Sequence, residues 1–260
     1  MDTLVTFTNI PIIKHMLMLD VVFYGMGIAN ILAGNFSNER ISRLNAFSPQ
    51  VTSHFVQRFL TEIGAEKRLV TSTFGHFMCL YFLKELNIEL DIRFDTRAFD
   101  VSVEKPFTNV SNLYISRNGL SALASTEDCS PFSDLLNCCL TRRCKLNVQS
   151  PMHPHVYDTI RQMYENGWTI ENMAISIVSL ETPQPCPICR EVMKGEVVQT
   201  ACRHYFCVRC WANHWKHSVG DIDNNIFRFN LVGHPIKINC PMCRREMNSW
   251  ECAPLKDDTS

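Results

Sequence analysis

The sequence of 260 residues has no marked excess of charge of either sign. It carries 25 lysine and arginine residues against 26 aspartate and glutamate residues, a formal net charge of −1 at pH 7. A chain this close to neutrality has no global field that would attract nucleic acid or anionic lipid. The sequence also lacks a basic face with interleaved aromatic residues, so we expect no nucleic-acid partner.

Short motifs for phosphate binding and for a nucleophilic serine are also missing. The chain has no glycine-rich phosphate loop, no G-x-S-x-G elbow, no internal repeat and no low-complexity tract. It shows no signal peptide. These absences disfavour the common nucleotide-dependent and hydrolytic enzymes, and they favour a protein of the cell interior.

Long hydrophobic runs are scarce, and one segment could be either a membrane span or a buried helix. Residues 16–34 (MLMLDVVFYGMGIANILAG) are apolar enough and about long enough to span a bilayer. Asp20 and Asn30 lie inside the run, and a central aspartate costs about 2.5 to 3.5 kcal/mol on insertion scales, although Asp20 is nearer one end. We therefore expect a helix buried in a domain core, and we regard a membrane anchor as the weaker alternative.

Cysteine is abundant, and its spacing near the C-terminus is the most informative feature of the chain. Three C-x2-C pairs, one further cysteine and one histidine form the pattern C-x2-C, C-x-H-x2-C-x2-C, C-x2-C. Each pair lets two thiolates close on one metal ion, and zinc is the expected ion. The ligands are Cys186, Cys189, Cys202, His204, Cys207, Cys210, Cys240 and Cys243.

Eight ligands complete two tetrahedral shells and leave no coordination position for water, which predicts two structural zinc ions and no catalytic one. Buried free thiols or disulfides are the alternative, disfavoured by the repeated pairing. The remaining cysteines show no framework spacing, and reduced thiolates for metal indicate the cytoplasm or the nucleus. His214, His217 and His234 lie between Cys210 and Cys240 and are alternative ligands.

The order of these ligands resembles the C3HC4 RING finger family from Pro185 to about Met247. The resemblance implies an interleaved, cross-braced arrangement. The first zinc ion would bind Cys186, Cys189, Cys207 and Cys210, and the second Cys202, His204, Cys240 and Cys243. Ile188, Pro241 and Arg244 match the family outside the ligand set.

The resemblance implies the activity of an E3 ubiquitin ligase, which docks a ubiquitin-charged E2 enzyme and positions ubiquitin for transfer to a substrate lysine. Ile188, Pro241 and either Trp215 or Trp211 would form the apolar E2-docking groove. Arg244 would bridge E2 and ubiquitin, because a guanidinium offers several donors in a fixed plane. The alternatives are a non-catalytic interaction or scaffold module and a transcription regulator.

The gap between Cys210 and Cys240 is long for the family. Trp211 to His217 resembles the helix that members place there, and Phe227, Phe229 and Leu231 alternate like a strand of an inserted hairpin or flap.

The rest of the chain predicts an α+β fold, with a mainly helical N-terminal domain that holds a small antiparallel sheet. We expect helices at about 52–63, 66–86, 130–141 and 154–166. Residues 88–94 and 99–103 alternate as a β-hairpin, and 113–117 form a further strand.

Four segments follow from these patterns. Residues 1–180 form the N-terminal domain. By elimination, we expect this domain to bind the protein substrate, whose identity is unknown. Residues 181–185, with two prolines, are the linker. Residues 186–248 form the finger, and 249–260 a C-terminal tail.

Overall fold

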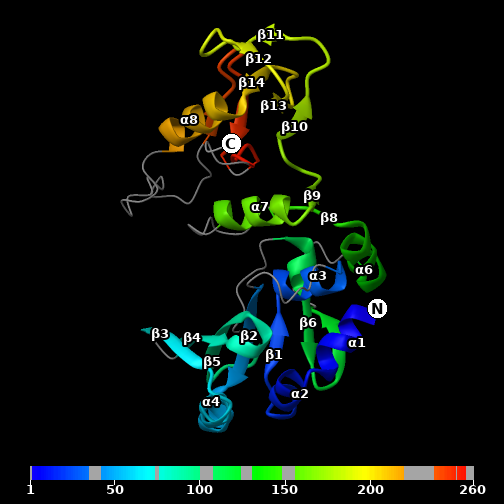
Figure 1. Ribbon diagram of the computed structural model, residues 1–260, viewed down its shortest axis with the longest axis vertical. Coiled ribbons are helices and arrows are strands. Elements are labelled where there is room, and N and C mark those ends of the chain that lie inside the picture. Colours follow the sequence, from blue (N-terminus) through cyan, green and yellow to red (C-terminus); the bar gives the residue numbers. More distant parts are fainter. Residues whose placement is uncertain are drawn as a thin grey trace. The chain divides into compact units, whose positions relative to one another are not determined.

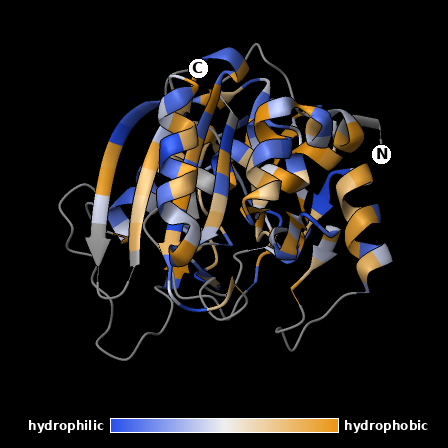
Figure 2. Ribbon diagram, turned by 90° about the horizontal axis from the view of Figure 1, so that it is seen from below, coloured by the Kyte–Doolittle hydropathy of each residue, from blue (hydrophilic) through white to orange (hydrophobic). Residues whose placement is uncertain are grey.

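The computed structural model describes residues 2–34, 42–73, 76–99, 108–123, 131–147, 156–219, 237–249 and 251–255 (Figure 1). The chain forms two compact units, residues 1–148 and residues 149–260. The helices carry hydrophobic and hydrophilic residues together (Figure 2), as expected of helices with one packed side.

A seven-stranded sheet dominates the first unit, in the order β3-β4-β5-β2-β1-β6-β7. Its strands are β1 (Val22–Tyr24), β2 (Ser42–Pro49), β3 (Glu66–Thr73), β4 (His76–Leu83), β5 (Ile88–Asp95), β6 (Leu113–Ser116) and β7 (Gly119–Ala122). The α-helices are α1 (Asp2–Asn9), α2 (Pro11–Met18), α3 (Met26–Leu32), α4 (Ser53–Glu62) and α6 (Phe132–Thr141). Short 3-10 turns are η1 (Gln50–Thr52), η2 (Lys84–Leu86) and η3 (Asn109–Asn112), and a short strand, β8, spans Arg143–Cys144.

The sheet is mixed, because β2 and β5 run parallel at its centre whereas the other neighbouring strands are antiparallel. Along β5 the side chains alternate between buried and half-buried, so one face of the sheet forms the core. Phe94 on this face stacks on its cross-strand partner Phe77 with ring centroids 4.6 Å apart.

Helices α1 and α3 pack on the core face. Phe7 of α1 meets Phe23 of β1 edge to face, with centroids 5.8 Å apart. Helix α3 approaches β2 so closely that a Cβ at Gly27 would lie 2.6 Å from Leu44 Cδ2 and 3.0 Å from the Arg43 carbonyl oxygen. Packing therefore favours glycine at position 27, because a side chain there would displace Leu44 and press on the backbone of β2.

The expectation of a mainly helical N-terminal domain was wrong. Residues 66–86, predicted as one helix, form β3, β4 and η2. Both faces of β4 carry apolar side chains, with Cys79 and Tyr81 in the core and Leu80 half-buried. The sequence of this strand therefore does not alternate between polar and apolar residues. Without that alternation, periodicity alone does not distinguish a buried strand from a buried helix.

The segment 16–34 is not one helix of either kind. It consists of the end of α2, strand β1 and helix α3, with Asp20 at a positive φ of 60° between the first two. Among the described residues, no helix has the length and apolar content needed to cross a bilayer.

The predicted hairpin of 88–94 with 99–103 was also wrong, because β5 pairs with β4 on one side and β2 on the other. Residues 100–103 lie outside the described ranges. Four other predictions are confirmed: α4, α6, strand β6 and, in the second unit, α7 (Val156–Glu165).

In its described residues, the second unit contains small sheets and the helices α7 and α8 (Val208–Val219). Its strands are β9 (Thr169–Ile170), β10 (Ile175–Ser179), β11 (Gln184–Pro185), β12 (Val192–Met193), β13 (Glu196–Thr200), β14 (Tyr205–Cys207), β15 (Lys237–Asn239) and β16 (Glu246–Asn248). Strands β10, β13 and β14 form one sheet, and β11–β12 and β15–β16 form two hairpins.

The units divide at residues 148 and 149, whereas the sequence places a linker at 181–185. Strand β10 pairs along its whole length with β13, from Ile175 opposite Thr200 to Ser179 opposite Glu196. Within the expected linker, Gln184–Pro185 pairs with β12. These backbone hydrogen bonds attach residues 175–185 to the zinc-ligand region.

A buried carboxylate closes the C-terminal end of β5. The Asp95 side chain is 1% exposed and lies 2.9 Å from Arg97 Nη2 and 3.3 Å from Arg93 Nη2. Hydrogen bonds from the Arg97 side chain are the main reason that the pKa of Asp95 lies far below its usual range. The ionised form therefore stabilises the first unit.

Asp95→Asn is expected to destabilise the first unit by about 1 kcal/mol at pH 7, less than a fully buried charge-assisted hydrogen bond contributes, because solvent screens the half-exposed Arg97. A folded-state pKa below the unfolded value of about 3.9 stabilises the fold above that pH and loses this effect as pH falls further. The difference between wild type and variant should thus shrink below about pH 4. Hydrogen exchange of β5 amides at pH 7 and pH 3 measures it, and an equal difference at both values would contradict the role of the charge.

Candidate metal centre

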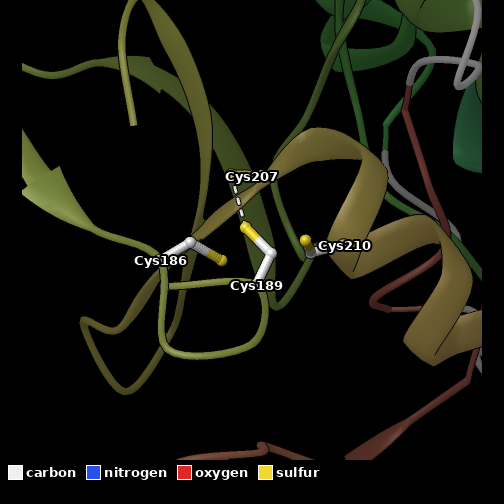
Figure 3. A group of neighbouring side chains, drawn as sticks. All are labelled: Cys186, Cys189, Cys207 and Cys210. Atoms are coloured by element: carbon white, nitrogen blue, oxygen red, sulfur yellow. Dashed lines mark hydrogen bonds between the residues drawn. The ribbon is translucent and has the colours of Figure 1, made fainter. Parts of the chain in front are cut away.

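The first ligand group is built from one turn, one strand and one helix. Cys186 and Cys189 come from the turn after β11, Cys207 ends β14, and Cys210 lies in the first turn of α8. The four sulfur atoms lie within 4.8 Å of one another. Figure 3 shows the four side chains converging, with the Cys189 and Cys207 sulfurs 3.9 Å apart.

The second ligand group joins the loop before β14 to the turn between β15 and β16. Cys202, His204, Cys240 and Cys243 place their ligand atoms within 4.8 Å of one another. His204 uses Nδ1, which lies 3.3 Å from Cys202 Sγ and 3.5 Å from Cys240 Sγ. The two groups alternate along the chain, so the interleaved arrangement implied by the resemblance is confirmed.

The two C-x2-C turns nearest the ends of the ligand set have the same sequence pattern, Cys-Pro-x-Cys-Arg. In each, the arginine after the second cysteine has a left-handed backbone, with φ of 65° at Arg190 and 59° at Arg244. The Arg190 amide donates to the Cys186 carbonyl (2.8 Å), and the Arg244 amide donates to the Cys240 carbonyl (2.9 Å). The first and last turns therefore have matching backbone geometry.

The donor set fits zinc. Three or four thiolates with at most one imidazole, arranged within one tetrahedron, is the ligand chemistry of structural zinc sites. Backbone N–H groups at Cys207, Cys189 and Ile188 outweigh the effect of burial and lower the pKa of Cys186 to about 7. Such N–H donors favour the thiolate form that metal binding requires.

Not all four thiols ionise easily together. Burial, together with neighbouring Cys189 and Cys186, raises the pKa of Cys210 to about 12. A divalent cation offsets this repulsion, and proton release on binding makes zinc affinity fall as pH falls. The eight residues would hold two zinc ions, which supply rigidity to loops that have little apolar core.

Thr200 supports the second ligand group and was not predicted. It is buried (2% exposed), and its hydroxyl lies 3.1 Å from Cys202 Sγ. The same oxygen accepts a hydrogen bond from the His204 amide at 3.1 Å. Thr200 therefore fixes the short Cys-x-His loop, and a single threonine in a strand gives no signal of this in the sequence.

The two tryptophans of α8 face inward. Trp211 and Trp215 are 0% and 2% exposed. The Trp211 indole N–H donates to the Cys252 carbonyl (3.0 Å), and that of Trp215 donates to the Ser249 carbonyl (2.8 Å). These side chains pack the finger against the segment after β16 and are not available as an E2-docking surface, contrary to the sequence-based expectation.

Residues beyond the predicted finger belong to its fold. Ser249, Cys252 and Ala253 are fully buried. The Ala174 amide donates to the Glu251 carbonyl (2.6 Å), and the Ala174 carbonyl accepts from the Ala201 amide (2.7 Å). The segment predicted as a C-terminal tail is therefore packed through residue 255.

The remaining predicted surface residues are exposed. Ile188 is 41% exposed, and Pro241 and Arg244 also lie at the surface. His214 Nε2 contacts the Asn239 carbonyl oxygen (2.9 Å), and His217 is exposed; within the described residues neither joins a ligand group. His234 and the expected flap strand at 227–231 lie outside the described residues.

Comparison with known protein families identifies this region. Residues 186–243, from the first to the last ligand, match the family described as Zinc finger, C3HC4 type (RING finger). All eight residues of the two interleaved ligand groups lie within the matched range. Residues 186–243 of this chain are therefore a C3HC4-type RING finger with sites for two zinc ions.

Proposed function

We propose that the protein is a RING-type E3 ubiquitin ligase that binds a ubiquitin-charged E2 enzyme and promotes transfer of ubiquitin to lysines of a protein substrate. The observation that carries the proposal is the closed, cross-braced RING finger. Both ligand groups are complete with protein side chains, so neither zinc ion would have a free position for substrate or water. A finger of this kind acts by positioning partners, which is the chemistry that an E3 ligase requires.

Three exposed side chains on the two matching turns support a role in partner binding. Ile188 occupies the tip of the first turn, and Met242 (52% exposed) occupies the same place in the second. Large exposed apolar side chains at the tips of rigid turns are suited to insertion into a partner surface. Arg244 follows the second turn, where its charged side chain is available for E2 and ubiquitin.

The test is ubiquitination with purified protein, E1, a panel of E2 enzymes, ubiquitin and ATP. We expect zinc-dependent chains with at least one E2. Ile188→Ala should weaken E2 binding about tenfold or more, as expected for loss of an interface anchor, while zinc content and thermal stability stay unchanged.

Val51→Ala is the matched control, because Val51 is an exposed aliphatic residue (79%) of the first unit. It should leave E2 binding unchanged. Absence of activity with every E2, or an Ile188→Ala variant that loses zinc before it loses E2 affinity, would favour a scaffold module.

A further inference from the structure

A cavity of about 520 Å³ lies in the first unit, within the 300–1,000 Å³ range typical of ligand sites. Four chain segments line it: the start of β1, the end of β2, the residues after β5, and the turn between β6 and β7. None of these segments belongs to the zinc sites. The cavity therefore has no part in the function proposed so far.

The apolar side of the cavity is rigidly packed. Phe99 lines it together with Val21, Val22 and Phe47. The Phe99 ring lies 5.1 to 5.5 Å, centroid to centroid, from the rings of Tyr24, Phe47 and Tyr114. Because aromatic contacts on three strands hold this ring, the surface is preformed for an apolar side chain.

Two arginines line the polar side, and each is held by a carboxylate. Arg97 forms a two-point contact with Asp95 through Nε (3.2 Å) and Nη2 (2.9 Å), which leaves Nη1 without a partner among the described residues. Arg117 Nη1 lies 3.1 Å from Asp20 Oδ1. Both guanidinium groups remain accessible, with side chains 50% and 63% exposed.

We propose that this cavity binds a linear segment of the substrate protein in which an apolar residue adjoins aspartate or glutamate. The apolar side chain lies on Phe99, Phe47 and Val21, and the carboxylate accepts hydrogen bonds from Arg97 and Arg117. The proposal rests on the ligase function, because it makes the first unit the substrate-binding part of the enzyme.

The charge of the lining favours a carboxylate over a phosphoryl group. The side chains that line the cavity carry two positive charges and one negative charge, from Arg97, Arg117 and Asp20. One net positive charge matches a monoanion, and the repulsion from Asp20 is larger for a dianionic phosphoryl group than for a carboxylate. Arg97 is also fixed in orientation by Asp95, so it presents its free edge without further loss of side-chain freedom.

The experiment uses the full-length, zinc-loaded protein on an array of peptides Gly-Ser-X-Y-Gly-Ser in which X and Y run through all amino acids. We expect the strongest binding where an apolar residue adjoins Asp or Glu. In solution, fluorescein-labelled Gly-Ser-Leu-Glu-Gly-Ser should bind about tenfold or more tightly than the Leu-Gln peptide, since charge-assisted hydrogen bonds are lost with the carboxylate.

Three variants locate the binding. Arg97→Lys keeps the charge but loses the planar fork, and Arg117→Gln removes a charge at an exposed position; each should weaken binding about tenfold. Ala98→Phe should block the cavity without any change of charge, because Ala98 lines it. Arg58→Gln is the control, since Arg58 is an exposed, ion-paired arginine on α4. It should bind like wild type.

No preference for acidic over amide peptides, or full binding by the Ala98→Phe variant with an unchanged melting temperature, would overturn the proposal. Tighter binding of the Leu-phosphoserine peptide than of Leu-Glu would also overturn it in favour of a phosphopeptide site. Peptide binding is measured without E2, and ligase activity is measured as ubiquitin discharge to free lysine without substrate. Failure of one assay is therefore distinct from failure of the other.

Discussion

Removal of zinc is expected to unfold the second unit while the first unit stays folded. Structural zinc contributes roughly 10 to 16 kcal/mol of apparent free energy in small fingers. In the described part of the chain, the buried hydrophobic cluster at Cys186 contains just two other residues, Met193 and Val197. The first unit has its own core on a seven-stranded sheet, and all eight zinc ligands lie in the second unit. Metal analysis should give two zinc ions per chain before chelation.

The two units can be followed separately. All four tryptophans lie between residues 168 and 250, so tryptophan fluorescence reports on the second unit alone. Hydrogen exchange of amides in β4 and β5 reports on the first. A chelator should change the fluorescence and leave the exchange unchanged. A single zinc ion, or fluorescence that a strong chelator does not alter, would contradict the two-site assignment.

Because the two zinc sites are cross-braced, mutation of a single ligand is expected to disturb both sites. Cys207 and His204 belong to different zinc groups but are separated by only two residues, so loss of either zinc ion should loosen the other site. Cys186→Ser and His204→Ala are therefore expected to have the same effect on fluorescence and zinc content. His217→Ala, an exposed histidine of α8, is the control. First-site affinity unchanged by His204→Ala would indicate two independent sites.

Loss of the Arg244 guanidinium is expected to slow ubiquitin discharge about ten- to a hundredfold. Charge-assisted hydrogen bonds contribute roughly 1.5 to 3 kcal/mol each, and about 1.4 kcal/mol corresponds to a tenfold change in rate. If Arg244 contacts E2 and ubiquitin together only in the reactive arrangement, the rate falls while the affinity for free E2 stays the same. Single-turnover discharge and E2 titration measure the two effects separately.

The backbone supplies matched controls for Arg244. Arg190 has the same left-handed conformation at the same place in the first turn, so Arg190→Ala tests whether any arginine of this geometry matters. Glycine adopts a left-handed backbone without the strain of about 1 kcal/mol that other residues have there, so Arg244→Gly should not destabilise this turn. Its ubiquitin discharge should nevertheless be as slow as that of Arg244→Ala. Arg244→Lys should recover only part of the rate, and Arg245→Ala should be silent. Equal discharge by Arg244→Ala and wild type would remove Arg244 from the mechanism.

The zinc ligands could be predicted because their signal is local and chemical. A C-x2-C pair needs no knowledge of the rest of the fold, and the eight ligands of the prediction are those that converge in the structure. Helices with a polar side, such as α4 and α7, were predictable for the same reason, because their period of 3.6 residues is intrinsic to the segment.

The large sheet could not be read in the same way. In β3 and β4, outward positions such as Leu80 and Leu69 are apolar, so the alternation that marks a strand is missing. The burial of Trp211 and Trp215 could not be predicted from the sequence either. Their indole N–H groups donate to the carbonyl groups of residues 252 and 249, which are distant in sequence. Tertiary partners decided both outcomes.

The chain between Cys210 and Cys240 is held in place at both ends, which affects how its length can change. On one side α8 ends at the buried Val219, and on the other β15 is hydrogen-bonded to β16. With both ends fixed, each doubling of the intervening chain costs only about 0.6 kcal/mol of closure entropy. Residues can therefore be inserted between these two fixed ends with little loss of stability of the metal-binding framework.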